Sequence, residues 1–240
     1  MLSPANYGKS LSFSLHVYTE PKLFTVTPIP GGLDSAAAAP LLCAGVTVYS
    51  ALRKTNAESG KWVIISGAGG GLGHLAVQLS SKGIGHRVIG IDHSSKKDLI
   101  MESGAEHFIP VDGTENMVAA VQELTEGLGA HAVVVCTANN AAYANSLDLL
   151  RFGGRVVCVG IPEGDVVPMK CASPGMMVGK SLQIVGSAVG DRREAIETMD
   201  FARRGIIKTH FRTEKMEKLT SVFEEMHRGE LKGRVVLDLS

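Results

Sequence analysis

A glycine-rich loop between two apolar runs constrains the fold of this chain most. Trp62–Ser66 is short, apolar and rich in β-branched residues, which is typical of a buried strand. It leads into the glycine-rich residues 67–73, and helical spacing of apolar side chains begins at Leu72. A second apolar run, residues 87–91, ends in Asp92. Strand, glycine loop, helix, strand and acid follow one another in the order of a dinucleotide-binding βαβ unit.

The chemistry of that unit explains its residue types. Glycines lack a Cβ atom and let the backbone approach a pyrophosphate, while the helix start supplies free N–H groups and positive dipole charge. The strict G-x-G-x-x-G spacing fails, and the best register is Ala68-x-Gly70-x-x-Gly73. Asp92 lies close to the expected offset of about 20 residues, where it can accept both ribose hydroxyls. The alternatives are a plain strand-to-helix turn for the loop and a helix cap for Asp92.

Further apolar runs alternate with helical patterns along the chain. This alternation predicts an α/β fold, with a doubly wound parallel Rossmann sheet covered on both faces. The expected later strands are residues 107–109, 132–136, 154–160 and 181–187. The expected helices are residues 35–42 with a break or kink at Pro40, 46–54, 95–102 capped by Ser94, 116–125 and 141–150.

Both ends of the chain depart from this pattern. Residues 12–18 and 24–30 look like short strands that cannot form a core alone. The tail predicts charged helices at 194–203 and 215–227 and a strand at 235–239, which we expect to pair with the N-terminal fragment. The expected domains are a small remnant at 1–33, a dinucleotide-binding domain at 34–190, and C-terminal helices with a strand returning to the remnant at 191–240.

Composition excludes several classes of function. The formal net charge is zero and no basic stripe occurs, so nucleic acid is a poor partner. Hydrophobic residues make up 45% of the chain, enough for a sizeable core, yet no apolar run reaches the roughly 18 residues of a membrane span. The N-terminus lacks a signal-peptide pattern, and the four cysteines are widely spaced with no C-x-x-C. We expect a cytoplasmic protein that acts on a small molecule.

Several longer stretches of sequence point to one family. They are residues 39–49 (APLLCAGVTVY), 65–73 (ISGAGGGLG), 90–92 (GID) and 184–187 (IVGS), with Gly233 and Arg234 near the end. In these stretches the chain resembles the zinc-type medium-chain alcohol dehydrogenases, closest to the yeast and fungal enzymes, from about Ser12 to the C-terminus. The resemblance implies an NAD-dependent oxidoreductase for a small alcohol or carbonyl substrate.

The resemblance also implies residue roles. Cys43 matches the third protein ligand of the catalytic zinc, Thr47 matches a residue beside the nicotinamide, and Asp92 matches the acid that favours NAD over NADP. Lys97 is assigned to the adenosine ribose and Arg234 to the pyrophosphate. The remaining candidates for cofactor binding are Gly67, Gly69, Gly70, Gly71, Leu72, Gly73, Val159 and Ser187.

The metal ligands are where the chain departs from this family. The family's first zinc cysteine, its Gly-His-Glu motif and its four-cysteine structural zinc loop have no counterpart here. A catalytic zinc needs three protein ligands and an open position. Only Cys43 remains, because His16 lacks the family's spacing. We therefore expect most of the catalytic domain and its zinc to be missing, and Cys43 to be a thiol lining a pocket or core or a reactive nucleophile.

Three functions stay open. The first is an oxidoreductase that works without zinc, with Cys43, Thr47 and Tyr49 as catalytic candidates. Tyr49, Thr47 or a water would then polarise the substrate, although Tyr49 also suits a core position. The second is a non-redox isomerase, cyclase or lyase that uses the opened cofactor cleft, and the third is a non-catalytic partner or scaffold. His74, next to the loop, is either a phosphate contact or a solvated side chain.

The strand expected at 181–187 would end the sheet if the strand order is 3-2-1-4-5-6. It is apolar and carries no proline or lysine between Leu182 and Ser187, so an uncovered edge there would be an aggregation hazard. The family resemblance implies pairing of this strand across a two-fold axis. We expect a homodimer that joins the two sheets through this edge.

Overall fold

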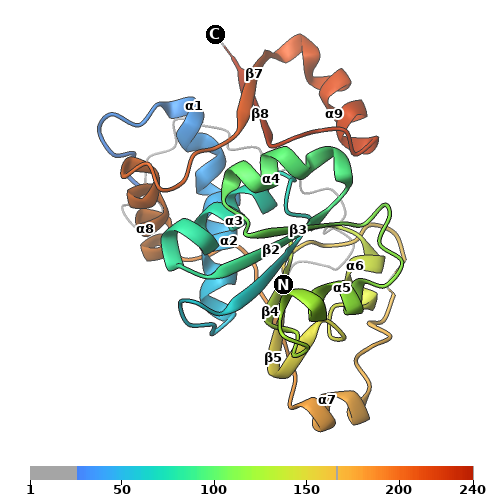
Figure 1. Ribbon diagram of the computed structural model, residues 1–240. Coiled ribbons are helices and arrows are strands. Elements are labelled where there is room, and N and C mark those ends of the chain that lie inside the picture. Colours follow the sequence, from blue (N-terminus) through green and yellow to red (C-terminus); the bar gives the residue numbers. More distant parts are fainter. Residues whose placement is uncertain (1–25, 166, 240) are drawn as a thin grey trace, which may run out of the picture.

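The computed structural model describes residues 26–165 and 167–239. The expected strand at 12–18, His16 and most of the expected remnant domain lie outside the described residues. The described part of the expected strand at 24–30, residues 26–30, is irregular and runs into a turn at Gly31 and Gly32. The chain then forms a central sheet with helices on both faces and a small C-terminal unit beside α1 (Figure 1).

Six parallel strands form the central sheet, in the order β3-β2-β1-β4-β5-β6. Their bounds are β1 Trp62–Ser66, β2 Arg87–Asp92, β3 His107–Pro110, β4 Ala130–Val135, β5 Leu150–Cys158 and β6 Gln183–Gly186. This order confirms the predicted doubly wound α/β fold. It also brings the carboxyl ends of β1, β2, β4 and β5 to one edge of the sheet, because all the strands are parallel.

Alternating side chains of the central strands build two cores. Val63 and Ile65 of β1 and Val134 of β4 face one core, whereas Ile64 and Val133 face the other. Successive side chains of a strand point to opposite faces, so a strand covered on both faces is apolar throughout. The first core packs against α2, α3, α4 and α8, and the second packs against α5, α6 and α7.

Most helices follow the sequence pattern, with one capping difference. Their bounds are α1 Ser35–Ala38, η2 Ala39–Leu42, α2 Ala44–Lys54, α3 Gly73–Gln78, η3 Leu79–Ile84, η4 Ser94–Lys96, α4 Lys97–Ser103, α5 Met117–Leu124, α6 Asn140–Ala144, α7 Pro174–Lys180, α8 Arg192–Arg203, η5 Met216–Lys218 and α9 Leu219–His227. The α-helix ends at Ala38, and Pro40 lies in the 3-10 helix η2, so the predicted break is present there. The bend of 44° comes after it, at Cys43, between η2 and α2. The cap of η4 is His93 rather than Ser94, whose hydroxyl bonds Asp112 instead.

Among the described residues, no single helix is long and apolar enough to cross a membrane, and only the bent pair of residues 35–42 and 44–54 reaches that length and composition.

Two predicted elements around residue 150 are wrong in extent. The helix expected at 141–150 is only α6, because Asn145 leaves helical geometry with ψ near 2° and a turn follows. The strand expected to begin at Gly154 begins at Leu150. An irregularity in its pairing with β4 accommodates the extra residues.

The C-terminal strand has a partner that the sequence did not indicate, while its expected pairing with the N-terminal fragment stays a prediction, because residues 1–25 lie outside the described residues. β8 (Arg234–Asp238) pairs in parallel with β7 (Phe211–Lys215) in a separate two-stranded sheet. In the part of the chain that the structure describes, β8 has no pairing with the N-terminal fragment. The sequence did not indicate β7, because Phe-Arg-Thr-Glu-Lys is largely charged and polar. The two-stranded sheet lies with α9 beyond the carboxyl edge of the main sheet (Figure 1).

Candidate functional site

The glycine loop lies at the carboxyl edge of the sheet, and close packing shapes it. Gly67 has a left-handed φ of +78°, which glycine adopts without a Cβ penalty. A Cβ on Gly73 would come within 2.0 Å of the Gly67 carbonyl oxygen, so only glycine lets the start of α3 approach the loop. A Cβ on Gly67 would meet Thr137 at the end of β4. These glycines are therefore required by contacts within the protein.

Gly70 is different. A Cβ on Gly70 would have only the Gly67 carbonyl oxygen nearby, at 3.4 Å, which is ordinary contact. The protein's own packing therefore leaves space over this residue. The neighbouring N–H groups of Gly71 and Leu72 have no hydrogen-bond acceptor among the described residues. Free N–H groups beside an open backbone, one residue before a helix, make an anion cradle.

Arg234 brings a positive charge to this cradle from the far end of the chain. Its Nε donates to the Gly71 carbonyl oxygen at 3.0 Å, and a Cβ on Gly71 would collide with the same side chain. Burial lowers the pKa of the Arg234 guanidinium, and no carboxylate in the described ranges forms an ion pair with it. Arg234 is half-buried, and a cation that has lost part of its hydration without gaining a carboxylate would be stabilised by a bound anion.

His74 joins the glycine loop to the C-terminal unit. Its ring is fully buried, so neither alternative from the sequence was right. Nδ1 lies 2.9 Å from the Gly70 carbonyl oxygen, and Nε2 accepts the backbone N–H of His210 at 3.1 Å. These partners select the neutral tautomer with the proton on Nδ1. Burial lowers the pKa of His74 to about 4.

Asp92 lies at the tip of β2, as predicted, and holds the loop. Its carboxylate accepts the N–H of Gly69 at 2.9 Å and that of His93 at 2.8 Å. The nearby cation is Lys96, whose Nζ lies 3.6 Å from the carboxylate, whereas Lys97 is exposed. The i,i+4 spacing of Asp92 and Lys96 was the signal that could have identified Lys96. The loop and the acid are thus brought together as the βαβ pattern predicts.

Cys43 and Thr47 lie on the first turn of α2. Thr47 donates its hydroxyl proton to the Cys43 carbonyl oxygen at 2.6 Å and is 8% exposed. Cys43 is close enough to Arg234 to raise the pKa of its guanidinium, opposing part of the burial effect. The start of α2 therefore approaches the anion cradle.

Tyr49 belongs to a different surface of α2. Its hydroxyl donates to Glu197 of α8 at 2.7 Å, and its ring meets Phe201 edge-on at 5.5 Å between centroids. Burial, followed by the hydrogen bond to Glu197, raises the pKa of Tyr49 to about 12. The structure thus does not bring Tyr49 together with Cys43 and Thr47, since this hydroxyl is engaged between two helices.

Val159 and Ser187 mark the strand ends farther along the same edge. Val159 follows β5, and its N–H donates to Val135 at 3.2 Å. Ser187 follows β6, and its hydroxyl accepts a hydrogen bond from Lys54 at 2.9 Å. Both lie at the carboxyl edge, as expected for parallel strands, but farther from the glycine loop in strand order than the end of β4.

The donor set does not fit a zinc centre. Within residues 26–165 and 167–239, no three His, Cys, Asp or Glu side chains gather where they could hold a metal ion. A tetrahedral zinc needs at least three such ligands, and Cys43 alone supplies one. We therefore assign no catalytic step to a metal ion held by the described residues.

Comparison with known proteins places these features in context. Residues 71–204 match the family model described as zinc-binding dehydrogenase. Alcohol dehydrogenase 2 of Emericella nidulans is 60% identical over 222 residues, which cover 90% of this chain and 60% of that protein. Alcohol dehydrogenase 2 of Caenorhabditis elegans is 36% identical over 235 residues, which cover 98% of this chain and 66% of that protein.

A solved structure shows the same architecture. The crystal structure of the alcohol dehydrogenase from the archaeon Aeropyrum pernix matches 84% of this chain and 57% of its own length, with 31% identity and a TM-score of 0.75. The chain thus spans less than two thirds of the length of each of these three relatives. These matches confirm the resemblance that the sequence indicated.

Proposed function

The chain belongs to the zinc-binding dehydrogenase family, and we propose that it binds NAD(H) at the glycine loop and acts as an alcohol dehydrogenase-like oxidoreductase. Its substrate would be a small alcohol or carbonyl compound. The observation that carries the proposal is the cradle made by the free N–H groups of Gly71 and Leu72 beside the half-buried Arg234. The named relatives are alcohol dehydrogenases, which supports the reaction class.

Each part of the cradle has a task in this proposal. The N–H groups of Gly71 and Leu72 and the Arg234 guanidinium would hold the pyrophosphate, since all three donate hydrogen bonds to oxyanions. Asp92 would accept the hydroxyls of the adenosine ribose, because its oxygens keep lone pairs beyond the two backbone bonds. A bound nicotinamide supplies the hydride acceptor.

The start of α2 would face the substrate side. Thr47 donates its own proton to a backbone carbonyl, so its hydroxyl oxygen remains an acceptor. It can therefore orient a substrate hydroxyl, whereas the Cys43 thiol would border the same space. We assign no polarising group to Tyr49, and no zinc to the described residues.

The cofactor preference gives a direct test. Asp92 should repel the 2′-phosphate of NADPH, and the nearby Lys96 should offset only part of that repulsion. Calorimetry should show NADH binding about tenfold tighter than NADPH, a gap of roughly 1.4 kcal/mol. Asp92→Ala should narrow this ratio, even if loosening of the loop weakens both cofactors.

Asp98→Ala is the matched control, because Asp98 is an exposed carboxylate on the neighbouring helix α4. It should leave the ratio unchanged. Equal affinity of the wild-type protein for both cofactors, or tighter NADPH binding, would refute the role of Asp92.

A non-redox reaction is the second candidate. It is favoured because the described residues contain no set of side chains that could hold a metal ion. An isomerase, cyclase or lyase would use the same cleft without net oxidation. Product analysis with and without NAD, after dialysis against a chelator, separates the two. Product that requires NAD and appears together with NADH supports the oxidoreductase. Product that forms without NADH supports the alternative.

A further inference from the structure

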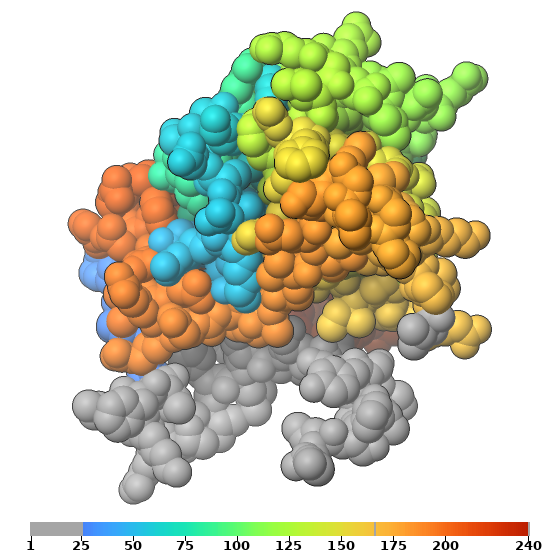
Figure 2. Space-filling model, turned by 90° about the horizontal axis from the view of Figure 1, so that it is seen from below, coloured from blue at the N-terminus to red at the C-terminus, as the bar shows by residue number. Residues whose placement is uncertain are grey.

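A polar cavity lies at the amino edge of the sheet, opposite the glycine loop. It encloses about 200 Å³ and is lined by the loop between α2 and β1 and by the first residues of β4, β5 and β6. Figure 2 views this side of the molecule, with the cyan segment of the α2–β1 loop beside yellow and orange segments of the later strands. The glycine loop follows β1 at the carboxyl edge, so this cavity is a separate site.

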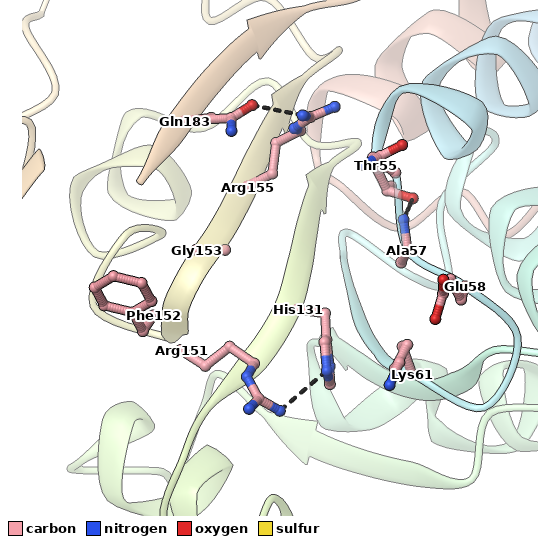
Figure 3. Close-up of a pocket in the computed structure, with 12 residues that line it drawn as sticks. Thr55, Ala57, Glu58, Lys61, His131, Arg151, Phe152, Gly153, Arg155 and Gln183 are labelled. Carbon is pink, nitrogen blue, oxygen red and sulfur yellow. Dashed lines mark hydrogen bonds between the residues drawn. The ribbon is translucent and has the colours of Figure 1, made fainter. Parts of the chain in front are cut away.

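An irregularity in the sheet builds the cavity. Ala130 pairs with Leu150 and Ala132 with Arg155, so four residues of β5 stand opposite the single residue His131. The extra residues push Phe152 outward, where it is 71% exposed, and Gly153 takes a left-handed φ of +73°. Such a bulge redirects side chains away from the regular pleat. Here it sets Arg151 beside His131 at the cavity wall (Figure 3).

The charges around the cavity do not balance. Lys61, Arg151 and Arg155 line it, against the single carboxylate of Glu58. None of these four side chains forms an ion pair within 4.0 Å in the described part of the chain. Arg155 is fixed by hydrogen bonds to the Lys54 carbonyl and Gln183, whereas the Lys61 ammonium has no acceptor among the described residues.

Both ring nitrogens of His131 face hydrogen-bond donors, which adds to the shortage of acceptors around the cavity. Its Nδ1 faces the backbone N–H of Trp62 at 3.2 Å, and its Nε2 faces the Arg151 guanidinium at 3.0 Å. Both neighbours are obligatory donors, and a neutral imidazole can accept at only one nitrogen. If Nδ1 accepts from Trp62, then Nε2–H and Arg151 present two donors to each other. An oxygen that accepts from both would resolve this conflict.

We propose that this cavity binds a small tetrahedral oxyanion, a phosphoryl or sulfuryl group, held by Lys61, Arg151 and His131. The ionised oxygens of such a group accept hydrogen bonds, and guanidinium and ammonium groups are their usual partners. The cavity is smaller than the roughly 300–1,000 Å³ of most ligand pockets, so it suits one such group and not a dinucleotide. The inference does not rest on the proposed redox function.

Site-resolved NMR with inorganic phosphate tests the proposal on the full chain at constant ionic strength. The amide signals of Lys61, His131, Gly153 and Gly154 should shift and saturate. Signals of Gly69, Gly70 and Gly71 report phosphate at the glycine loop separately. Arg151→Gln and Lys61→Gln should each weaken the saturable binding about tenfold, as expected for loss of one charge-assisted hydrogen bond.

Arg228→Gln is the control, since Arg228 is an exposed arginine at the end of α9. It should leave the phosphate titration unchanged. A parallel titration with sulfate distinguishes a general oxyanion site from one that prefers phosphate. The proposal is overturned if the cavity signals do not saturate, if only the glycine-loop signals move, or if both cavity variants bind phosphate as the wild type does.

Discussion

At the scale of single residues, His74 couples the glycine loop to the C-terminal unit. Its two ring nitrogens bond Gly70 and His210, and its neutral form is required because Nε2 accepts a backbone proton. Protonation would break that bond inside a buried site. The loop and the distant Arg234 are therefore held together by a group that must stay uncharged.

This arrangement predicts a pH-dependent stability. The pKa of His74 is about 4 in the folded chain against an ordinary value of 6.5, so the unfolded state binds more protons between these values. Its contribution is fully present above pH 6.5 and is lost as the pH falls towards 4. Urea unfolding should show a loss of about 2 kcal/mol from this group between pH 7 and pH 5. His74→Gln should remove that part of the slope, and His227→Gln should not. An unchanged slope in His74→Gln would contradict this role.

The residues of the site divide into those that sequence reasoning could predict and those it could not. Asp92 and the glycines follow from a local pattern, and the structure places them together. The Arg234 contact with Gly71 joins residues 163 apart, and only the family resemblance indicated it. His74 bonds the N–H of His210, the residue just before β7, and the charged sequence of β7 gave no sign of that strand. Local periodicity carries no information on such long-range contacts.

At the scale of elements, two surfaces of α2 make different contacts. Cys43 and Thr47 on its first turn approach the cradle, whereas Tyr49 packs against α8 through Glu197 and Phe201. A helical pattern alone could not assign these surfaces, because the position of α8 depends on the tertiary fold. The strand order, by contrast, was predictable, since alternating apolar strands and helices allow few connections.

Tyr49→Phe separates the two surfaces experimentally. The variant loses the hydrogen bond to Glu197 but keeps the ring contact with Phe201, so stability should fall by about 1 kcal/mol in urea unfolding. NADH affinity should remain that of the wild type. A fall in NADH affinity of about tenfold without loss of stability would instead return Tyr49 to the cofactor site.

At the scale of the whole molecule, the edge strand β6 is a possible pairing surface for a second copy of the chain. The Ser187 N–H points back to Cys158 of β5. Because backbone N–H groups alternate along a strand, that of Ile184 should point outward from the sheet. Ile184 is also 39% exposed, so the edge offers both free donors and apolar surface.

We propose that two chains pair through β6 to form a homodimer. Light scattering should show a dimer for the wild type. Ile184→Pro should yield a folded monomer, because it removes an outward donor while sparing the bonds to β5. Ile184→Thr keeps the donor and should remain dimeric. A monomeric wild type, or a proline variant that stays folded and fully dimeric, would count against this interface.

The central claim, that the glycine loop binds NAD(H), is tested most directly at Gly70. The protein itself tolerates a Cβ there, with the Gly67 oxygen at 3.4 Å, so Gly70→Ala should keep the wild-type melting temperature. The same Cβ would obstruct a pyrophosphate, and calorimetry should show NADH binding weakened about tenfold. Gly175→Ala, where a Cβ would meet nothing within 4 Å, is the control and should bind NADH as the wild type does. Wild-type NADH affinity in Gly70→Ala, or no NADH binding by the wild-type chain, would contradict the account.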